Sequence, residues 1–289
     1  MPDETPFVVE DVEYLRHDDA PLLARMFKPR GDGPFPALVM LHGGAWCMYD
    51  RFRESPVCEP LAASGILVMS IDFRMPPDAG YPASLADANY AVRWLKLHAE
   101  ELGTRPELVG VAGVSSGAHQ AMLGAMRPRD PRYAAISLDG GENIEATVAF
   151  AALCWPVIDP LGRYHYMQQL KAEGRDDGMA DSVLPSHDRY WGSEEAMAEG
   201  SPVRILERGE QVDLPDVLCV QSAVDRAHPR PHIERFTELY RAAGGQMELA
   251  IIEDGAGQFA RRNATSPAAV LGIDRIVEFV QSRASVAAR

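Results

Sequence analysis

The sequence predicts an α/β fold with a mostly parallel central sheet and helices on both faces. Short apolar runs, typical of strands buried on both sides, alternate with segments of helical periodicity along most of the chain. At residues 108–123 an apolar run, a tight glycine-flanked turn and a helix-compatible segment follow one another directly. Strands that alternate with helices pair in parallel and need helices on each face of the sheet.

The elements can be placed in chain order. Residues 8–15 and 22–28, joined by a polar turn, predict an antiparallel hairpin at the sheet edge. The remaining expected strands are 36–41, 66–72, 108–112, 146–154, 216–221 and 247–252. Helices are expected at 52–64, 83–102, 118–123, 229–243 and 267–282. In 83–102 the apolar residues recur at alternating three- and four-residue steps, which places them on one helix face.

Residues 155–214 interrupt this alternation with prolines, an aromatic cluster and a charged stretch. A segment of this length between two strands predicts a lid over the carboxyl edge of the sheet. Asp159 and Arg163, just past the strand that leads into it, are expected to brace the lid. The 289 residues, 46% hydrophobic, suffice for one large core, so we expect a single domain over 1–289 with 155–214 inserted.

Composition excludes several classes of function. A net charge of −14 argues against binding to nucleic acid or to an anionic membrane surface. No run of 18 apolar residues occurs, and the acidic residues 1–5 predict no signal peptide. The four cysteines lack metal-ligand spacing and are expected to be reduced, which predicts a cytoplasmic protein without a metal or organic cofactor.

Two glycine-containing turns carry the predicted chemistry. The G-x-S-x-G turn at 113–117 follows a strand and opens a helix, which presents Ser115 as a nucleophile. The second turn, at 42–46, follows the strand 36–41 and lets backbone N–H groups approach an oxyanion. We expect these donors to be Gly44, Ala45 and Ser116, with Gly43 shaping the turn. His42 is interpreted as orienting the loop through a hydrogen bond.

Asp225 lies just past the strand 216–221, where a carboxylate can orient a histidine. With these three features the chain resembles the α/β-hydrolase superfamily over residues 8–280. It is most similar to the esterase/lipase-like branch that has an HGG oxyanion loop, with hormone-sensitive-lipase-type esterases and kynurenine formamidases. The resemblance implies the order Ser, Asp, His and a histidine in the turn after the last strand.

That histidine position is occupied by Gln258, and no histidine follows His232. A glutamine can hydrogen-bond to Ser115 and be held by Asp225, but it cannot accept and return a proton near neutral pH. Three explanations remain open. In the first, the chain is an inactivated hydrolase. In the second, its pocket catalyses an elimination, cyclisation or isomerisation. In the third, another histidine takes the place of the missing one. His228 is then the candidate, while His119 is interpreted as a packing residue.

The favoured function is hydrolysis of a carboxylic ester or amide of a small, apolar substrate. The alternatives are a non-hydrolytic lyase, cyclase or isomerase in the same pocket, and a catalytically silent ligand-binding protein. Four lid and loop aromatics either line the substrate pocket or form a small core of their own: Trp46, Tyr164, Tyr166 and Trp191. A small-molecule substrate is the expected partner, and the sequence leaves a homodimer open.

Overall fold

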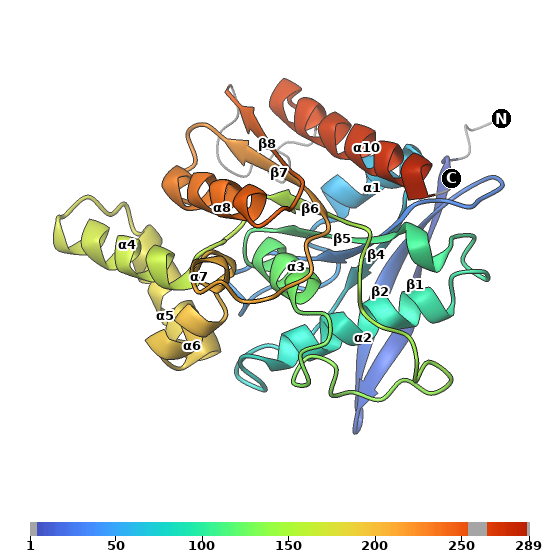
Figure 1. The fold of residues 1–289 in the computed structure, drawn as a ribbon, viewed down its shortest axis with the longest axis horizontal. Helices are drawn as coiled ribbons and strands as arrows, with labels where there is room; N and C mark the ends of the chain where they lie inside the picture. The colour runs from blue at the N-terminus through green and yellow to red at the C-terminus, as the bar shows by residue number, and fades with distance from the viewer. Residues whose placement is uncertain (1–4, 254–264, 288–289) are drawn as a thin grey trace.

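The computed structural model describes residues 5–253 and 265–287, and within them one sheet has the strand order β1-β2-β4-β3-β5-β6-β7-β8 (Figure 1). Its strands are β1 Phe7–His17, β2 Ala20–Pro29, β3 Ala37–Leu41, β4 Leu67–Ile71, β5 Val109–Val114, β6 Phe150–Cys154, β7 Asp216–Ser222 and β8 Met247–Ile252. Strands β1 and β2 form the expected antiparallel hairpin, and β2 is antiparallel to β4. All pairs from β4 to β8 are parallel, so the predicted sheet is confirmed.

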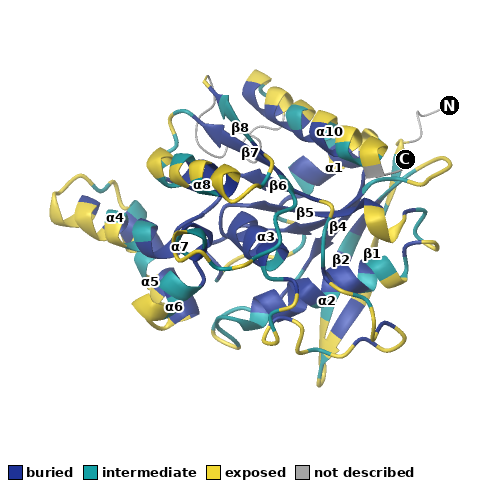
Figure 2. Ribbon diagram, in the orientation of Figure 1, coloured by how far each residue is buried: buried dark blue, intermediate teal, exposed yellow. Residues whose placement is uncertain are grey.

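Helices cover both faces of this sheet, as the alternation predicted (Figure 1). They are α1 Ser55–Ala63, α2 Ala83–Leu97, α3 Ser116–Met126, α8 Arg230–Ala242 and α10 Pro267–Ala287, with a 3₁₀ turn at Pro106–Leu108. Successive residues of a strand point to opposite faces. Val39 and Leu41 of β3 therefore join the core under α2, α3 and α8, while Leu38 and Met40 join the core under α1 and α10. The central strands β3 to β7 are dark blue in Figure 2 because both of their faces are buried, whereas the edge strands β1, β2 and β8 are partly exposed.

Some element boundaries differ from the sequence prediction. The helix expected over 83–102 ends at Leu97, because the backbone tightens into a turn in which the N–H of Ala99 donates to the carbonyl of Lys96. The strand expected over 146–154 begins only at Phe150, since its ladder with β5 pairs residues 151–154. The helix expected from residue 52 begins at Ser55.

Residues between β6 and β7 form four helices that the sequence reading did not anticipate. They are α4 Pro160–Ala172, α5 Met179–Trp191, α6 Glu194–Glu199 and α7 Pro202–Glu207, which lie together at one end of the molecule (Figure 1). Local signals for them exist. Pro160 and Pro202 stand in first turns, and the Ser193 and Ser201 side chains accept hydrogen bonds from the N–H groups of the helices they cap. The role of this insertion as a lid stays a prediction.

The carboxyl-terminal half of the insertion is fastened to the main domain. The N–H of Tyr81 donates to the carbonyl of Tyr190 at 2.8 Å. His119 in α3 contacts the carbonyl of Gly200 through Nε2, also at 2.8 Å. The Glu199 carboxylate accepts a hydrogen bond from the Tyr81 hydroxyl. Opening of the insertion as one rigid body would break these contacts together.

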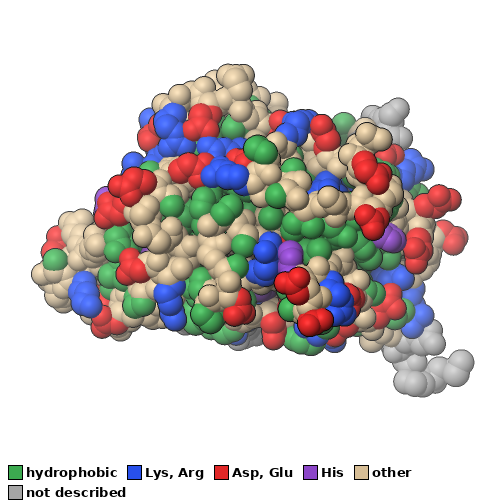
Figure 3. All heavy atoms as spheres, turned by 90° about the horizontal axis from the view of Figure 1, so that it is seen from below, with side chains coloured by type: hydrophobic (Ala, Val, Ile, Leu, Met, Phe, Trp, Pro, Cys, Tyr) green, Lys and Arg blue, Asp and Glu red, His purple; other side chains and the backbone are tan. Residues whose placement is uncertain are grey.

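The surface carries charges of both signs. On the face seen in Figure 3, acidic and basic side chains are interspersed with hydrophobic ones. Within the described ranges no helix combines the length and the hydropathy needed to cross a bilayer. The same part of the chain holds no cluster of three or more His, Cys, Asp or Glu side chains arranged to bind a metal.

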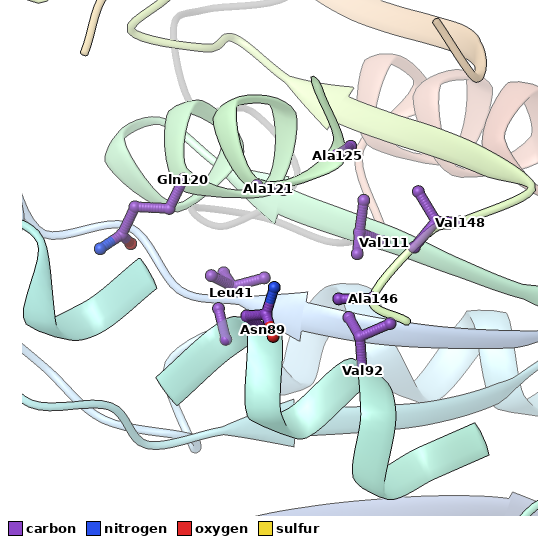
Figure 4. Close-up of a pocket in the computed structure, with 11 residues that line it drawn as sticks. Leu41, Asn89, Val92, Val111, Gln120, Ala121, Ala125, Ala146 and Val148 are labelled. Atoms are coloured by element: carbon purple, nitrogen blue, oxygen red, sulfur yellow. The ribbon is translucent and has the colours of Figure 1, made fainter. Parts of the chain in front are cut away.

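A small apolar cavity lies between α2, α3 and the sheet (Figure 4). Its volume is about 20 Å³, and Leu41, Val92, Val111 and Ala125 are among its lining residues. A space of this size holds about one water molecule. It is therefore a packing defect of the core and is too small for a substrate.

The two-sided burial of the sheet generates a stability prediction. We expect Leu218→Ala in β7, whose side chain is fully buried between helices and sheet, to lower the free energy of unfolding by about 2–5 kcal/mol. The control is Leu271→Ala in α10, where half of the side chain is exposed and the expected loss is below about 1 kcal/mol. Urea unfolding of both variants measures the difference. Equal losses would contradict the assignment of β7 to the core.

Candidate active site

Ser115 occupies a strained turn between β5 and α3. Its backbone has φ 56° and ψ −116°, a conformation that costs a non-glycine residue roughly 1–3 kcal/mol. Two backbone hydrogen bonds hold it there: the N–H of Ser115 donates to Cys154 at 2.9 Å, and its carbonyl accepts from Val157 at 3.2 Å. The following glycine must lack a side chain, because a Cβ on Gly117 would lie 2.2 Å from the carbonyl oxygen of Leu41.

The strand order brings the two glycine-containing turns together. β3 is hydrogen-bonded to both β4 and β5, so the chain reverses its direction across the sheet at this point. Ligands of open parallel sheets bind at the carboxyl ends of the strands beside such a switch. Leu41 pairs with Gly113, which places the loop after β3 directly beside Ser115.

Ser115, His228 and Asp225 form a continuous hydrogen-bonded chain. Ser115 Oγ lies 2.8 Å from His228 Nε2, and His228 Nδ1 lies 2.8 Å from Asp225 Oδ2. The other carboxylate oxygen of Asp225 accepts hydrogen bonds from the backbone N–H groups of Ala227 and His228. All three side chains are buried, with only 2% of the Asp225 and His228 side chains exposed.

The carboxylate determines which tautomer this histidine adopts. Asp225 accepts but cannot donate when ionised, so Nδ1 of His228 carries the proton and Nε2 is free to accept the hydroxyl proton of Ser115. Burial raises the pKa of Asp225, but the neighbouring His228 imidazole and the two backbone N–H groups outweigh burial. The pKa of Asp225 therefore lies below its ordinary value, and the group is ionised at neutral pH.

Position 258, the expected partner of Asp225, lies outside the described residues. The structure gives the Asp225 carboxylate a different partner, His228, which the sequence reading held only as a substitute. The chain order Ser, Asp, His is kept, but the histidine follows Asp225 by three residues in the loop after β7. A D-x-x-H spacing at the end of a strand, next to the helix start at Pro229, is the sequence signal that points to it.

The loop after β3 contains two backbone N–H groups that form no hydrogen bond with the described residues. Gly43 donates its N–H to the buried Glu54 carboxylate at 3.1 Å, and Trp46 donates its N–H to Ser116 Oγ at 3.1 Å. The N–H groups of Gly44 and Ala45 make no hydrogen bond among the described residues. Gly44 has φ 125°, and a Cβ there would lie 2.2 Å from the Met48 carbonyl oxygen, so this position requires glycine. The steric requirement for glycine is thus shown at Gly44, and the shaping role expected of Gly43 stays a prediction.

A cavity of about 280 Å³ opens onto Ser115 and His228. Gly44 and Ala45 form one part of its wall, so the loop after β3, Ser115 and His228 line a common space. The remaining lining residues are Met48, Tyr49, Arg53, Arg163, Met179, Ser182, Val183 and Ala227. The volume is that of a small-ligand site.

The four aromatic residues expected near the substrate do not appear among the described residues that line this cavity. Trp46 is 1% exposed, stacks on Tyr190 at 5.4 Å and meets Trp191 edge-on at 5.5 Å. Tyr164 packs at the margin of that cluster and donates its hydroxyl to an aspartate, while Tyr166 packs in the core between α4 and α5. The structure thus places them in the insertion's own core, the second of the two expectations.

Two further histidines near the site have structural roles. His42 contacts the carbonyl of Gly43 through Nδ1 at 2.8 Å and stacks on Phe73, which fits the interpretation of an orienting residue. His119 receives the indole N–H of Trp46 at Nδ1 and donates from Nε2 to the Gly200 carbonyl. Burial lowers the pKa of His119 to about 4, so the ring is neutral at pH 7.

This architecture defines the class of fold. The strand order, the strained serine turn and the loop after β3 are those of an α/β-hydrolase fold. The BD-FAE family model matches residues 26–157, which include both glycine-containing turns.

Curated relatives narrow the comparison. Esterase LipC of Mycobacterium tuberculosis is 27% identical over 225 residues, covering 75% of this chain and 52% of LipC. The probable carboxylic ester hydrolase LipM of the same organism is 30% identical over 143 residues, covering 48% of this chain and 33% of LipM. The chain thus spans about half or less of the length of these relatives.

Solved structures agree with the fold over nearly the whole chain. A hyperthermophilic esterase from the archaeon Pyrobaculum calidifontis matches with a TM-score of 0.76 and 22% identity, covering 96% of this chain and 84% of that one. Esterase 2 of Thermogutta terrifontis matches with a TM-score of 0.73 and 24% identity, covering 97% and 96%.

The neutral buried His119 generates a pH prediction. Its pKa of about 4 in the folded state lies below the ordinary 6.5, so only the unfolded state binds a proton between these values. The contribution of the neutral His119 to the free energy of unfolding is present above pH 6.5 and is lost as pH falls toward 4. The free energy of unfolding should therefore fall between pH 7 and pH 5. We expect His119→Gln, whose amide can keep both hydrogen bonds, to make this fall smaller by about 2 kcal/mol. Urea unfolding at both pH values tests this, and an unchanged pH dependence would contradict it.

Proposed function

We propose that the chain is a serine ester hydrolase with Ser115 as nucleophile, His228 as general base and Asp225 as the residue that orients and stabilises the imidazole. The observation that carries the proposal is the buried Ser115–His228–Asp225 chain, with both hydrogen bonds 2.8 Å long. A serine hydroxyl becomes an effective nucleophile when a positioned base takes its proton. The similarity to esterases supports an ester as substrate.

In the first half of the reaction, Ser115 Oγ attacks the ester carbonyl while its proton passes to His228 Nε2. The carbonyl oxygen becomes an oxyanion, which we propose is held by the N–H groups of Gly44, Ala45 and Ser116. Such donors act strongly because they are already oriented before charge develops. The imidazolium, stabilised by Asp225, then protonates the leaving alkoxide, and the acyl group remains on Ser115.

In the second half, water takes the place of the alcohol. His228 removes a proton from the water, the hydroxide attacks the acyl-enzyme and the carboxylic acid leaves as the proton returns to Ser115 Oγ. Since proton acceptance and return need a group that titrates near neutral pH, a histidine suits both steps.

The contact between Ser115 and His228 also helps to choose among the alternative functions, a lyase, cyclase or isomerase and a silent binding protein. A lyase, cyclase or isomerase would use the oxyanion loop without an acyl-enzyme, and a silent binding protein would need no base at all. The His228 bond to Ser115 supports acyl transfer, which needs a base that takes the serine proton, and it argues against a silent binding protein; the similarity to esterases favours hydrolysis over a lyase. We further propose a small-molecule substrate, supported by the size of the cavity beside Ser115, and a cytoplasmic location, supported by the reduced thiols of Cys47, Cys58 and Cys219.

The first test removes the base and restores a histidine at the other candidate position. We expect 4-nitrophenyl acetate hydrolysis by the unaltered chain, and a fall in kcat of about 10⁴–10⁶ for Ser115→Ala and for His228→Gln. Gln258→His should gain less than about threefold, because one base already contacts Ser115. His165→Gln, an exposed histidine of α4, is the matched control and should leave activity unchanged.

The outcomes separate the candidates. If the chain is inert and Gln258→His gains orders of magnitude, the scaffold is an esterase that lacks its base and the role of His228 is wrong. If both proteins are inert and a fluorophosphonate fails to acylate Ser115, the hydrolase proposal itself is overturned.

A second test addresses Asp225. We expect Asp225→Asn to reduce kcat by about 10⁴, since an amide can place a donor against Nδ1 and force the wrong tautomer on His228. The thermal midpoint, followed by circular dichroism, should show that the variant is folded. A loss of less than tenfold in a folded variant would contradict the orienting role.

A further inference from the structure

The cavity beside Ser115 contains two arginines without acidic partners. Arg163, in the first turn of α4, is 4% exposed, and its Nε and Nη1 have no hydrogen-bond partner. Arg53 lies over the ring of Tyr49, 4.0 Å from its centroid, and its Nε is also unpartnered. Within the described part of the chain, neither guanidinium forms an ion pair with a carboxylate, and no Asp or Glu lines the cavity.

Such an arrangement is costly unless a ligand completes it. A buried charge that lacks hydrogen bonds loses its hydration without compensation. Burial lowers the pKa of Arg163 to about 10, so it remains charged at neutral pH, and the nearby Asp225 compensates only in part. Arg163 does not brace the insertion as expected. That contact is made by Asp159, whose carboxylate accepts hydrogen bonds from Ser201 and Arg204.

We propose that this cavity binds an ester that carries a carboxylate, and that Arg163, assisted by Arg53, holds that carboxylate while Ser115 attacks the ester. The inference rests on the proposed hydrolase function and names its substrate class. A planar guanidinium matches a carboxylate in geometry and can bind it through two parallel hydrogen bonds. The cavity of about 280 Å³ limits the substrate to a small molecule.

The overall charge of the protein cannot explain a preference for an anionic ester. At −14 the molecule as a whole repels anions. A preference for an anionic ester must therefore come from the arginines in the cavity. The apolar substrate expected from the sequence would leave both charges without partners.

The test compares esters that differ only in charge. Monomethyl glutarate and dimethyl glutarate share one skeleton and place the charge on the acyl part, and methyl release from each is followed by pH-stat titration. Acetoxyacetate and its methyl ester place the charge on the alcohol part, and acetate release is measured. We expect kcat/KM for at least one anionic ester to exceed that of its neutral partner by about tenfold or more.

Variants assign the preference to the cavity. Arg163→Met should lower kcat/KM for the preferred anionic ester by about 10–100-fold, mainly through KM, and change the neutral ester by less than about threefold. Arg163→Lys should retain part of the preference, and Arg53→Met should weaken it. Arg189→Met removes an exposed arginine of α5 that does not line the cavity, so it controls for overall charge.

The outcomes distinguish a carboxylate-binding role of Arg163 from a role as counter-charge to Asp225. If Arg163→Met slows both esters equally, Arg163 serves as a counter-charge to Asp225 and the inference is overturned while the hydrolase function stands. If the unaltered chain prefers the neutral esters, the inference is also overturned. Binding of glutarate to folded Ser115→Ala by calorimetry, lost in the double variant with Arg163→Met, supports the site even if turnover is absent.

Discussion

The site depends on a close approach of backbone to backbone between α3 and the end of β3. Gly117 lies so near the Leu41 carbonyl that no side chain fits between them. This contact brings the first turn of α3 against the loop after β3, and the pairing of Leu41 with Gly113 fixes the same relation from the sheet side. The proposed oxyanion donors and the proposed nucleophile are thus positioned by rigid main chain on both sides, rather than by flexible side chains.

The sequence predicted the scaffold well because its signals are local. Apolar runs identified the strands. The glycines around Ser115 and at Gly44 were recognised because a tight turn directly after a strand needs residues without a side chain. The histidine partner of Asp225 was not predicted, because its position depends on how the loop after β7 folds over the carboxyl edge. The family resemblance implies a histidine after the last strand, whereas the Asp225–His228 pair forms within a single loop. Helices α6 and α7 of the insertion begin at the serine caps Ser193 and Ser201, but these short helices lack the long apolar periodicity by which a helix is predicted from sequence.

Burial sets the electrostatics around the site. It lowers the pKa of His119 to about 4 and that of His187 to about 3, so both rings, which pack against Trp46, stay neutral at pH 7. Arg163 instead keeps its charge in the same region, because a guanidinium retains its proton even after a considerable downward shift of its pKa. One positive group is thereby held fixed beside neutral histidines and the ionised Asp225, in a molecule that is otherwise strongly acidic.

Asp225 and His228 are only three residues apart in the sequence, and this short separation determines how partial unfolding would affect the proposed activity. When acid and base come from separate strands, any relative displacement of those strands pulls the pair apart. Here the pair belongs to one loop whose backbone N–H groups also bind the carboxylate. Partial opening of the carboxyl-terminal elements β8 and α10 would leave the acid–base unit whole as long as β5, β6 and β7 stay aligned. Fraying at this end of the chain and loss of turnover thus become separable events, with different midpoints along a denaturation curve.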